Sequence, residues 1–451
     1  MKEENQQAVI LPEILAAKMA AVGNFNAPAV REQLNAQPRL FELLWFIQAM
    51  SMRPGGLVKF VEEFLAEFYS RIGTATMRSA PKGNALCQDA ASEILPGYLA
   101  RVCNEPQTAI EDPWYFDGLL DALCEFMDNH AARTSASLAM TEVTLKIFDA
   151  MEYAWSEKAL VHIEGDSRFG KTVSVKTWCA AWPGKARYFA VPCSNSDADL
   201  IKAIALSLGM DFSFKTPYRQ IKAKVEYIIN FSGLMFIADE AHWLLPTRFS
   251  ANTPPMRLNW LRTEIVDRNC AVVTVSTPQD YRKCVEKFVK ATGHNITQFL
   301  GRTMLNVSLP NELEQDDLLA VARIHFPELS DDFLQVIVGT SMRSESYLMA
   351  VEAIAKRVRF IARRDNHPSV TLKDLKLAIS EIIPGQAAAP AATPAPPQRS
   401  APIAVKRSRA ATPAPAAVAM PPGRNRPAAV LPADEMTAPA RSITPATLIP
   451  A

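Results

Sequence analysis

Hydrophobic residues recur every three or four positions through much of residues 1–135. The clearest stretches are FELLWFIQAM at 41–50 and LVKFVEEFLAEFY at 57–69, and the turn RPGG separates them. This spacing places apolar side chains on one face of a helix, and the Pro-Gly turn interrupts it. No alternating strand pattern stands out in this part of the chain. We therefore predict an all-α N-terminal domain over residues 1–135, whose role the sequence does not declare.

From residue 136 the pattern changes to short apolar runs that alternate with helical stretches. The apolar runs lie at 159–163, 186–192, 234–238 and 271–276. The helical stretches between and around them lie at 140–155, 196–208, 217–230 and 256–267. Strands that alternate with helices of this length are typical of a parallel sheet with helices on both faces. The sequence predicts an α/β domain over residues 136–309.

Helical spacing returns over residues 310–383 and predicts a small helical subdomain after the sheet. Residues 384–451 hold 15 of the 33 prolines and no aromatic residue, so they bury too little apolar surface to offset the entropy of ordering. We predict a disordered Pro/Ala-rich tail. Its basic clusters either solubilise the tail or tether it to DNA or a protein partner; they comprise Lys406, Arg407, Arg409, Arg424 and Arg426.

Composition narrows the class of protein but does not indicate a function. Of 451 residues 49% are apolar and 21% charged, and the net charge of +1 means that any binding to nucleic acid must come from a local patch. The seven cysteines are scattered without a C-x-x-C pair, which disfavours a disulfide framework or a zinc module. No secretory signal stands out, and no apolar run is long enough to cross a bilayer as a helix. We expect a soluble, cytoplasmic protein with no membrane span.

The strongest chemical signal is the stretch EGDSRFGKT at 164–172, which follows a predicted strand and opens a predicted helix. It has the phosphate-loop pattern G-x-x-x-x-G-K-[ST], whose glycines let backbone amides approach an anion. Lys171 would reach the β- and γ-phosphates of ATP, and the Thr172 hydroxyl would ligate Mg²⁺. Arg168 and Phe169 occupy variable positions, where side chains can point away from the phosphates. The expected ATP-contacting residues are Gly165, Asp166, Ser167, Arg168, Phe169, Gly170, Lys171, Thr172 and Val173.

A second signal is the acidic pair Asp239 and Glu240, which ends the apolar run LMFIA well downstream of Lys171. Asp239 would hold Mg²⁺, and Glu240 would orient and activate the attacking water. Taken alone, the pair could be a helix N-cap followed by a first-turn acid. Its combination with the phosphate loop favours the catalytic interpretation. His242 follows in DEAH, either as a packing or capping residue or as a functional one.

Three further positions are weaker candidates. The run AVVTVS ends in Ser276, and Thr277 follows; a hydroxyl there could sense the γ-phosphate, or the segment could simply be a turn. Arg302 precedes the predicted helical subdomain, and Arg343 lies inside it. An arginine from a neighbouring subunit or from a lid can neutralise charge in the transition state, whereas a solvated surface arginine would do nothing.

Taken in order, these features resemble the AAA+ ATPases, over residues 137–383. The resemblance implies a parallel five-stranded sheet followed by a helical lid. It implies roles in ATP and Mg²⁺ binding for Lys171 and Thr172, in Mg²⁺ binding for Asp239, and in catalysis for Glu240. Thr277 or Ser276 would match the first sensor, Arg302 the arginine finger and Arg343 the second sensor. It also implies an ATPase whose hydrolysis depends on assembly.

With Ser-Arg at 167–168, the phosphate loop looks most like the loops of the branch related to origin-recognition ATPases. That branch includes transposition ATPases of the MuB and TnsC type. That branch implies a homo-oligomer that assembles on double-stranded DNA with ATP and recruits a transposase or another DNA-processing partner. Candidate DNA contacts, or else a solvated helix face, are Lys215, Arg219, Lys222 and Lys224.

Other functions fit less of the chain. The alternative is a nucleotide-driven signalling or defence switch that acts through the N-terminal helices without DNA. A chaperone-like motor that acts on protein is not supported, because we identify no aromatic pore loop in the sequence. The DEAH tetrad suggests a helicase, but the short interval between Thr277 and Arg302 leaves no room for a second motor domain.

Overall fold

The computed structural model describes residues 10–23, 39–72, 77–78, 85–86, 88–105, 118–194, 196–246, 254–294, 296–344 and 346–382. All of these residues belong to the first of the chain's two units, residues 1–389. The predicted tail, including the five clustered cations named above, lies outside the described residues. The division of residues 1–383 into three domains stays a prediction.

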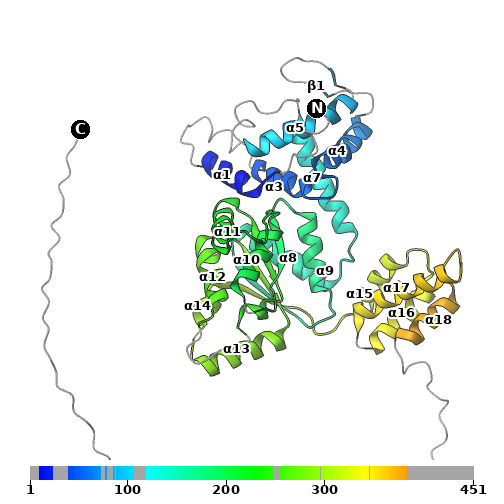
Figure 1. Cartoon of the computed structure of the whole chain (residues 1–451). Helices are drawn as coiled ribbons and strands as arrows, with labels where there is room; N and C mark the ends of the chain where they lie inside the picture. The colour runs from blue at the N-terminus through cyan, green and yellow to red at the C-terminus, as the bar shows by residue number, and fades with distance from the viewer. Residues whose placement is uncertain are drawn as a thin grey trace, which may run out of the picture. The chain divides into compact units, whose positions relative to one another are not determined.

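A five-stranded parallel sheet forms the centre of the chain, as the sequence predicted (Figure 1). Its strands are β3 (Leu160–Glu164), β4 (Ala186–Ala190), β5 (Met235–Asp239), β6 (Val272–Ser276) and β7 (Thr303–Ser308). Their order across the sheet is β4-β5-β6-β3-β7. The chain therefore leaves β3 toward one edge and returns to its other side with β7. Such a change of direction creates a crevice beyond the carboxyl end of the strand.

Both faces of the sheet are covered, and β5 shows how. All five of its residues are buried. Met235 and Ile237 pack in one core with α8 (Glu142–Glu157) and α9 (Lys171–Ala181). Phe236 and Ala238 pack in the other core with α10 (Asp197–Ser207), α11 (Tyr218–Ser232) and α12 (Met256–Glu264). Because successive strand residues face opposite sides, a strand covered twice appears in the sequence as a continuous apolar run.

Between β6 and β7 the chain forms two helices that the hydrophobic pattern did not predict, α13 (Pro278–Thr292) and α14 (Thr297–Leu300). Pro278 occupies the first helical position, and Gly293 ends α13 in the left-handed region with φ +71°. Both placements suit these residues, since proline needs no amide partner there and glycine has no Cβ penalty. Two 3-10 turns, η2 (Ala241–Leu244) and η3 (Val266–Arg268), flank α12.

Four helices follow the sheet and confirm the predicted helical lid. They are α15 (Gln315–His325), α16 (Asp331–Arg343), α17 (Tyr347–Arg364) and α18 (Leu372–Ile382). Acidic residues begin α15 and α16, and basic residues end α15, α16 and α17, so the charges complement the helix dipoles. No helix among the described residues is long and apolar enough to cross a membrane.

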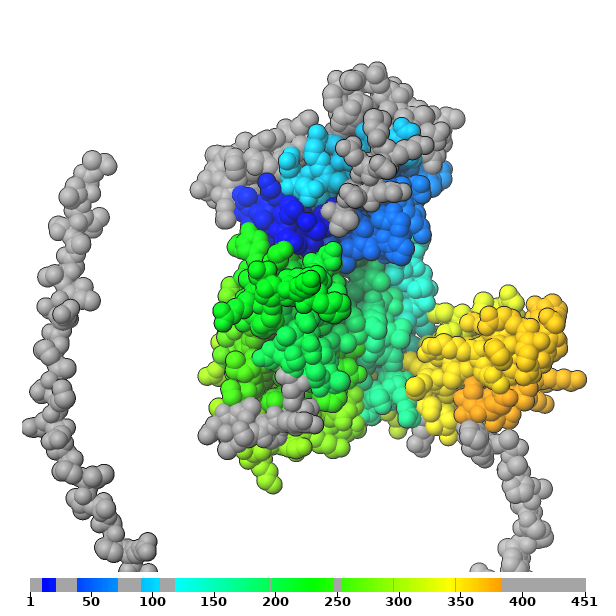
Figure 2. Space-filling model, viewed as in Figure 1, coloured from blue at the N-terminus to red at the C-terminus, as the bar shows by residue number. Residues whose placement is uncertain are grey.

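The N-terminal part is helical, as predicted, apart from one short hairpin. Its helices are α1 (Pro12–Gly23), α3 (Leu40–Ser51), α4 (Gly56–Ile72), α5 (Gln88–Asn104) and α7 (Leu119–Ala136). The hairpin pairs β1 (Met77–Arg78) with β2 (Ala85–Leu86), so the all-α expectation was too strict. The apolar side chains of these helices belong to the same buried core as Phe236 of the sheet. Figure 2 shows the blue N-terminal helices against the green surface that includes α11, which α1 contacts.

Buried polar contacts also join the N-terminal helices to the sheet domain. The Trp45 indole Nε1 donates to the carbonyl of Ser232 at 2.9 Å, and Gln48 Nε2 donates to the carbonyl of Leu208 at 3.3 Å. On β4, Arg187 Nη2 donates to Gln48 Oε1 at 2.9 Å. Each of these groups would lose its hydrogen bond if the helices separated, so the contact is specific as well as apolar.

The close fit at this contact predicts a large effect for a small change at Gly184. A Cβ at this position would lie 2.3 Å from the backbone oxygen of Glu42 in α3. We expect Gly184→Ala to destabilise the protein by about 1–3 kcal/mol, because the backbone of α3 must shift. Gly339→Ala in α16 is the matched control, since nothing lies within 4 Å of its Cβ and alanine favours a helix. Urea unfolding of both variants checks the prediction; equal midpoints would contradict it.

Candidate functional site

The phosphate loop connects β3 to α9 and is shaped by its two glycines. Gly170 has φ +82° and precedes the first residue of α9. A Cβ on Gly165 would lie 2.8 Å from the Leu309 side chain. Arg168 also lies in the left-handed region, with φ +75°. The loop is thus compact, and the first turn of α9 directs its amides and the positive end of its dipole toward an anion.

Lys171 lies inside this loop. Its Nζ donates to the carbonyl oxygens of Gly165 at 2.5 Å and Asp166 at 2.7 Å. Burial lowers the pKa of Lys171, and the nearby carboxylates of Asp239 and Glu240 act in the opposite direction. The loop therefore holds a cation where phosphate oxygens would bind.

Thr172 and Asp239 meet, although 67 residues of sequence separate them. Asp239 is buried, and its Oδ2 accepts hydrogen bonds from Thr172 Oγ1 at 2.8 Å and from the Tyr188 hydroxyl at 3.0 Å. Its Oδ1 accepts from the backbone amide of Glu240 at 2.9 Å. A hydroxyl beside a carboxylate fits Mg²⁺, which prefers oxygen ligands and keeps several waters. Among the described residues, no group of three or more His, Cys, Asp or Glu could hold a metal ion.

Glu240 occupies a strained position at the carboxyl end of β5. Its backbone lies in the left-handed region, with φ +57° and ψ +43°, which costs a non-glycine residue about 1–2 kcal/mol. It is the N-cap residue of η2, and its side chain is half exposed and makes no capping hydrogen bond. His242 Nδ1 lies 3.4 Å from Glu240 Oε2. Strain of this kind concentrates at functional sites.

Ser276 and Thr277 differ in their surroundings. Ser276 is buried, with its Oγ 3.2 Å from His162 Nε2. His162 Nδ1 in turn lies 2.9 Å from Thr274 Oγ1, and burial lowers the pKa of this histidine. Thr277 is partly exposed at the N-cap position of α13. Of the two hydroxyls, that of Thr277 is the more accessible to a ligand.

Arg302 lies away from the phosphate loop of its own chain. It immediately precedes β7, whose first residue, Thr303, pairs with the first residue of β3, Leu160. The phosphate loop follows the other end of β3, roughly 16 Å along a five-residue strand. Arg302 Nε donates to Asp267 Oδ1 at 2.8 Å, and the side chain is half exposed.

The lid contacts the phosphate loop, but through other residues than Arg343. Arg343 is exposed in the last turn of α16. At the start of α17, the Tyr347 ring packs edge-on against buried Phe169, with centroids 5.2 Å apart. Leu348 is the nearest neighbour of Gly170, at 3.0 Å from its would-be Cβ. The side chain of Phe169 therefore points away from the anion site and into the core beside the lid.

Sequence reasoning also missed two side chains of α13 that hydrogen-bond to the phosphate loop and to the end of β3. Arg282 Nη2 donates to Glu164 Oε1 at 2.7 Å, and Gln279 Nε2 donates to Asp166 Oδ1 at 3.0 Å. Tyr188, which donates to Asp239, was missed as well, so three side chains support the candidate site from neighbouring elements. No local motif marks them, because their partners lie 51 to 118 residues away in the chain.

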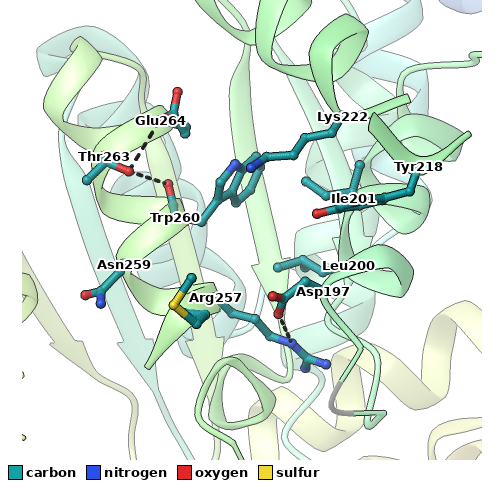
Figure 3. Close-up of a pocket in the computed structure, with 11 residues that line it drawn as sticks. Asp197, Leu200, Ile201, Tyr218, Lys222, Arg257, Asn259, Trp260, Thr263 and Glu264 are labelled. Carbon is teal, nitrogen blue, oxygen red and sulfur yellow. Dashed lines mark hydrogen bonds and ion pairs between the residues drawn. The ribbon is translucent and has the colours of Figure 1, made fainter. Parts of the chain in front are cut away.

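The candidate DNA contacts separate into two pairs. Lys215 and Arg219 are exposed. Lys224 pairs with Glu13 at 3.0 Å, and Lys222 lies 3.5 Å from Glu226. Lys222 also borders a cavity of about 250 Å³ between α10, α11 and α12, which shares no residue with the phosphate loop (Figure 3). Its lining residues are Asp197, Leu200, Ile201, Tyr218, Lys222, Met256, Arg257, Asn259, Trp260, Thr263 and Glu264.

No family model matches the chain. No curated protein matches it either. Among solved structures it is similar to the Orc2 protein of Aeropyrum pernix in ADPNP–ADP complexes, with 15% identity, 58% of this chain and 68% of that chain covered, and a TM-score of 0.38. It is also similar to Cdc6p of Pyrobaculum aerophilum, with 13% identity, 56% of this chain and 71% of that chain covered, and a TM-score of 0.40. A third similar structure is the RuvB Holliday junction branch migration motor of Thermotoga maritima, with 14% identity, 53% of this chain and 68% of that chain covered, and a TM-score of 0.35.

Proposed function

We propose that this protein is an ATPase of the AAA+ type. The observation that carries the proposal is the 2.8 Å hydrogen bond between Thr172 Oγ1 and Asp239 Oδ2. It joins the phosphate loop to the carboxyl end of a second strand, where an ion and its phosphates would lie. The change of chain direction at β3 puts this place at the sheet edge where parallel α/β sheets commonly bind ligands.

Each residue of the site has a task that its chemistry suits. The amides of α9 and the Lys171 ammonium hold the phosphates, and Thr172 and Asp239 hold Mg²⁺. When bound, the metal neutralises charge that develops on the phosphate oxygens. Glu240 orients a water molecule and accepts its proton as the water attacks the γ-phosphorus; the bond to the β–γ bridging oxygen breaks, and ADP and phosphate leave. Thr277 donates to the γ-phosphate from the end of β6.

Hydrolysis by this protein depends on assembly. Arg302 lies at the opposite end of β3 from the loop, so it contributes to catalysis only in the site of a neighbouring copy. The lid provides a second link, because Tyr347 and Leu348 contact the loop residues Phe169 and Gly170. Arg343, which ends α16 shortly before α17 begins, is the proposed second contact of the lid with the nucleotide. We propose a homo-oligomer that forms in the ATP state.

We further propose that the ATP-bound oligomer assembles on double-stranded DNA and recruits a transposase or another DNA-processing partner. Support comes from the sequence resemblance and from the two exposed cations Lys215 and Arg219. The alternative is a signalling or defence switch that acts without DNA. The core that the N-terminal helices share with the sheet favours it, since nucleotide-driven changes could pass through that core.

Anisotropy of a labelled DNA duplex at low salt tests the proposal with ATP, with ADP and without nucleotide. We expect the tightest binding with ATP. Lys215→Ala with Arg219→Ala should lower the slope of log affinity against log salt by about two. The matched control is Lys373→Ala with Lys376→Ala on α18, two lysines that are also exposed. ATP-driven oligomerisation without nucleotide-dependent DNA binding would reject the DNA role and favour the switch.

A further inference from the structure

Asp239 receives a hydrogen bond that the proposed mechanism does not use. The Tyr188 hydroxyl donates to Asp239 Oδ2, the same oxygen that accepts from Thr172 Oγ1. Tyr188 lies on β4 opposite Ile237 of β5, and Asp239 is two residues further along the same face. A tyrosine is long enough to reach this diagonal neighbour, whereas a shorter side chain is not.

The phenol is a reliable donor in this place. The phenol O–H donates and a carboxylate oxygen accepts, so the direction of this 3.0 Å hydrogen bond is set by the chemistry of the two groups. Lys176 of α9 lies with its Nζ 5.0 Å from the centre of the Tyr188 ring, a distance at which a cation attracts the ring face. The ring is thus held between the loop helix and the carboxylate.

The strand that carries Tyr188 is itself fixed by the N-terminal helices. In the sheet that the structure describes, β4 is an edge strand and pairs with β5. The adjacent residue, Arg187, is buried on the opposite face and donates to Gln48 Oε1 at 2.9 Å and to the carbonyl of Trp45 at 3.4 Å. These two residues of α3 add polar contacts to a strand that is paired on one side only.

We propose that Tyr188 is a positioning residue for the Mg²⁺–nucleotide site, whose hydroxyl holds Asp239 Oδ2 in the orientation that binds the metal. The inference rests on the proposed function and adds to it a residue from outside both motifs. With Tyr188 and Thr172 on one oxygen and the Glu240 amide on the other, the carboxylate has a single orientation. Loss of a partner of this kind typically lowers metal affinity by about 10- to 100-fold.

Tyr188→Phe tests the proposal, because it removes only the hydroxyl. The probe is Mn²⁺, titrated by electron paramagnetic resonance into the full-length protein with ADP. We expect the dissociation constant of Mn²⁺ to rise about ten-fold. The affinity for ADP in EDTA and the unfolding temperature should stay at wild-type values. Tyr227→Phe on α11, a partly exposed tyrosine packed against Phe231, is the matched control and should change none of the three.

Two results would overturn the proposal while leaving the ATPase function in place. One is an unchanged Mn²⁺ affinity of Tyr188→Phe beside a wild-type protein that binds Mn²⁺ with ADP. The other is an equal loss of metal-free ADP affinity, which would show that the hydroxyl supports the fold and not the metal. If the wild-type protein bound no nucleotide at all, the proposed function itself would fall, and the role of Tyr188 with it.

Discussion

Lys171→Ala will bind ATP at least about 100-fold more weakly than the wild-type protein. The change removes the ammonium group that lies within the loop, at 2.5 and 2.7 Å from the carbonyls of Gly165 and Asp166. Removing one partner of a buried charge pair typically costs about 2–5 kcal/mol, and a 100-fold loss corresponds to about 2.7 kcal/mol. A fluorescent ATP analogue and equilibrium titration measure the effect.

The control for this experiment is Lys146→Ala on α8. Lys146 is exposed and pairs with Glu142 one turn away, so its loss should leave ATP affinity unchanged. Circular dichroism of both variants verifies that the fold persists. An ATP affinity of Lys171→Ala within about three-fold of the wild-type value would mean that the loop is not the phosphate site.

Glu240→Gln will keep ATP binding and lose turnover. The glutamine amide preserves size and position at the strained end of β5, but it cannot accept the proton of the attacking water. A positioned general base contributes about 10²–10⁴-fold to rate, and we expect kcat to fall within that range. Because ATP then persists, the assembled state should accumulate, and size-exclusion chromatography with ATP should show it.

Glu328→Gln, at an exposed position before α16, serves as the control and should hydrolyse ATP at the wild-type rate. Normal turnover by Glu240→Gln would show that another residue activates the water. Loss of ATP binding in the same variant would instead place Glu240 among the binding residues. Lys171→Ala and Glu240→Gln thus separate the loss of ATP binding from the loss of ATP hydrolysis.

The hydrophobic pattern was most informative where strands are buried on both sides. β5 and β6 are fully buried, so their sequences are continuous apolar runs that can be recognised without a structure. β7 was missed because it is an edge strand whose residues alternate between partly buried and exposed. α13 was missed for a related reason: only Phe288 and Thr292 are buried along its 15 residues, which leaves a thin apolar stripe.

The candidate site likewise contains residues that the sequence reveals and residues that it does not. Gly170, Lys171 and Thr172 are adjacent in sequence, so a short motif reveals them. Asp239 and Glu240 were found because a strand end is itself a sequence signal. Tyr188 carries no such signal, since its relation to Asp239 depends on which face of β4 it occupies and on the register with β5. Arg302 was recognised as a candidate, but its distance from its own loop followed only from the pairing of β7 with β3.

The shared core of the N-terminal helices and the sheet limits how this protein can be divided. Cleavage near residue 137 would leave Phe236 and Phe189 without the helices that complete their core. It would also strip Arg187 of Gln48 and Trp45, leaving a buried cation with fewer acceptors. The N-terminal segment is therefore not a detachable module that recombination could exchange freely. We expect its sequence and that of the sheet face it covers, β4 included, to change together.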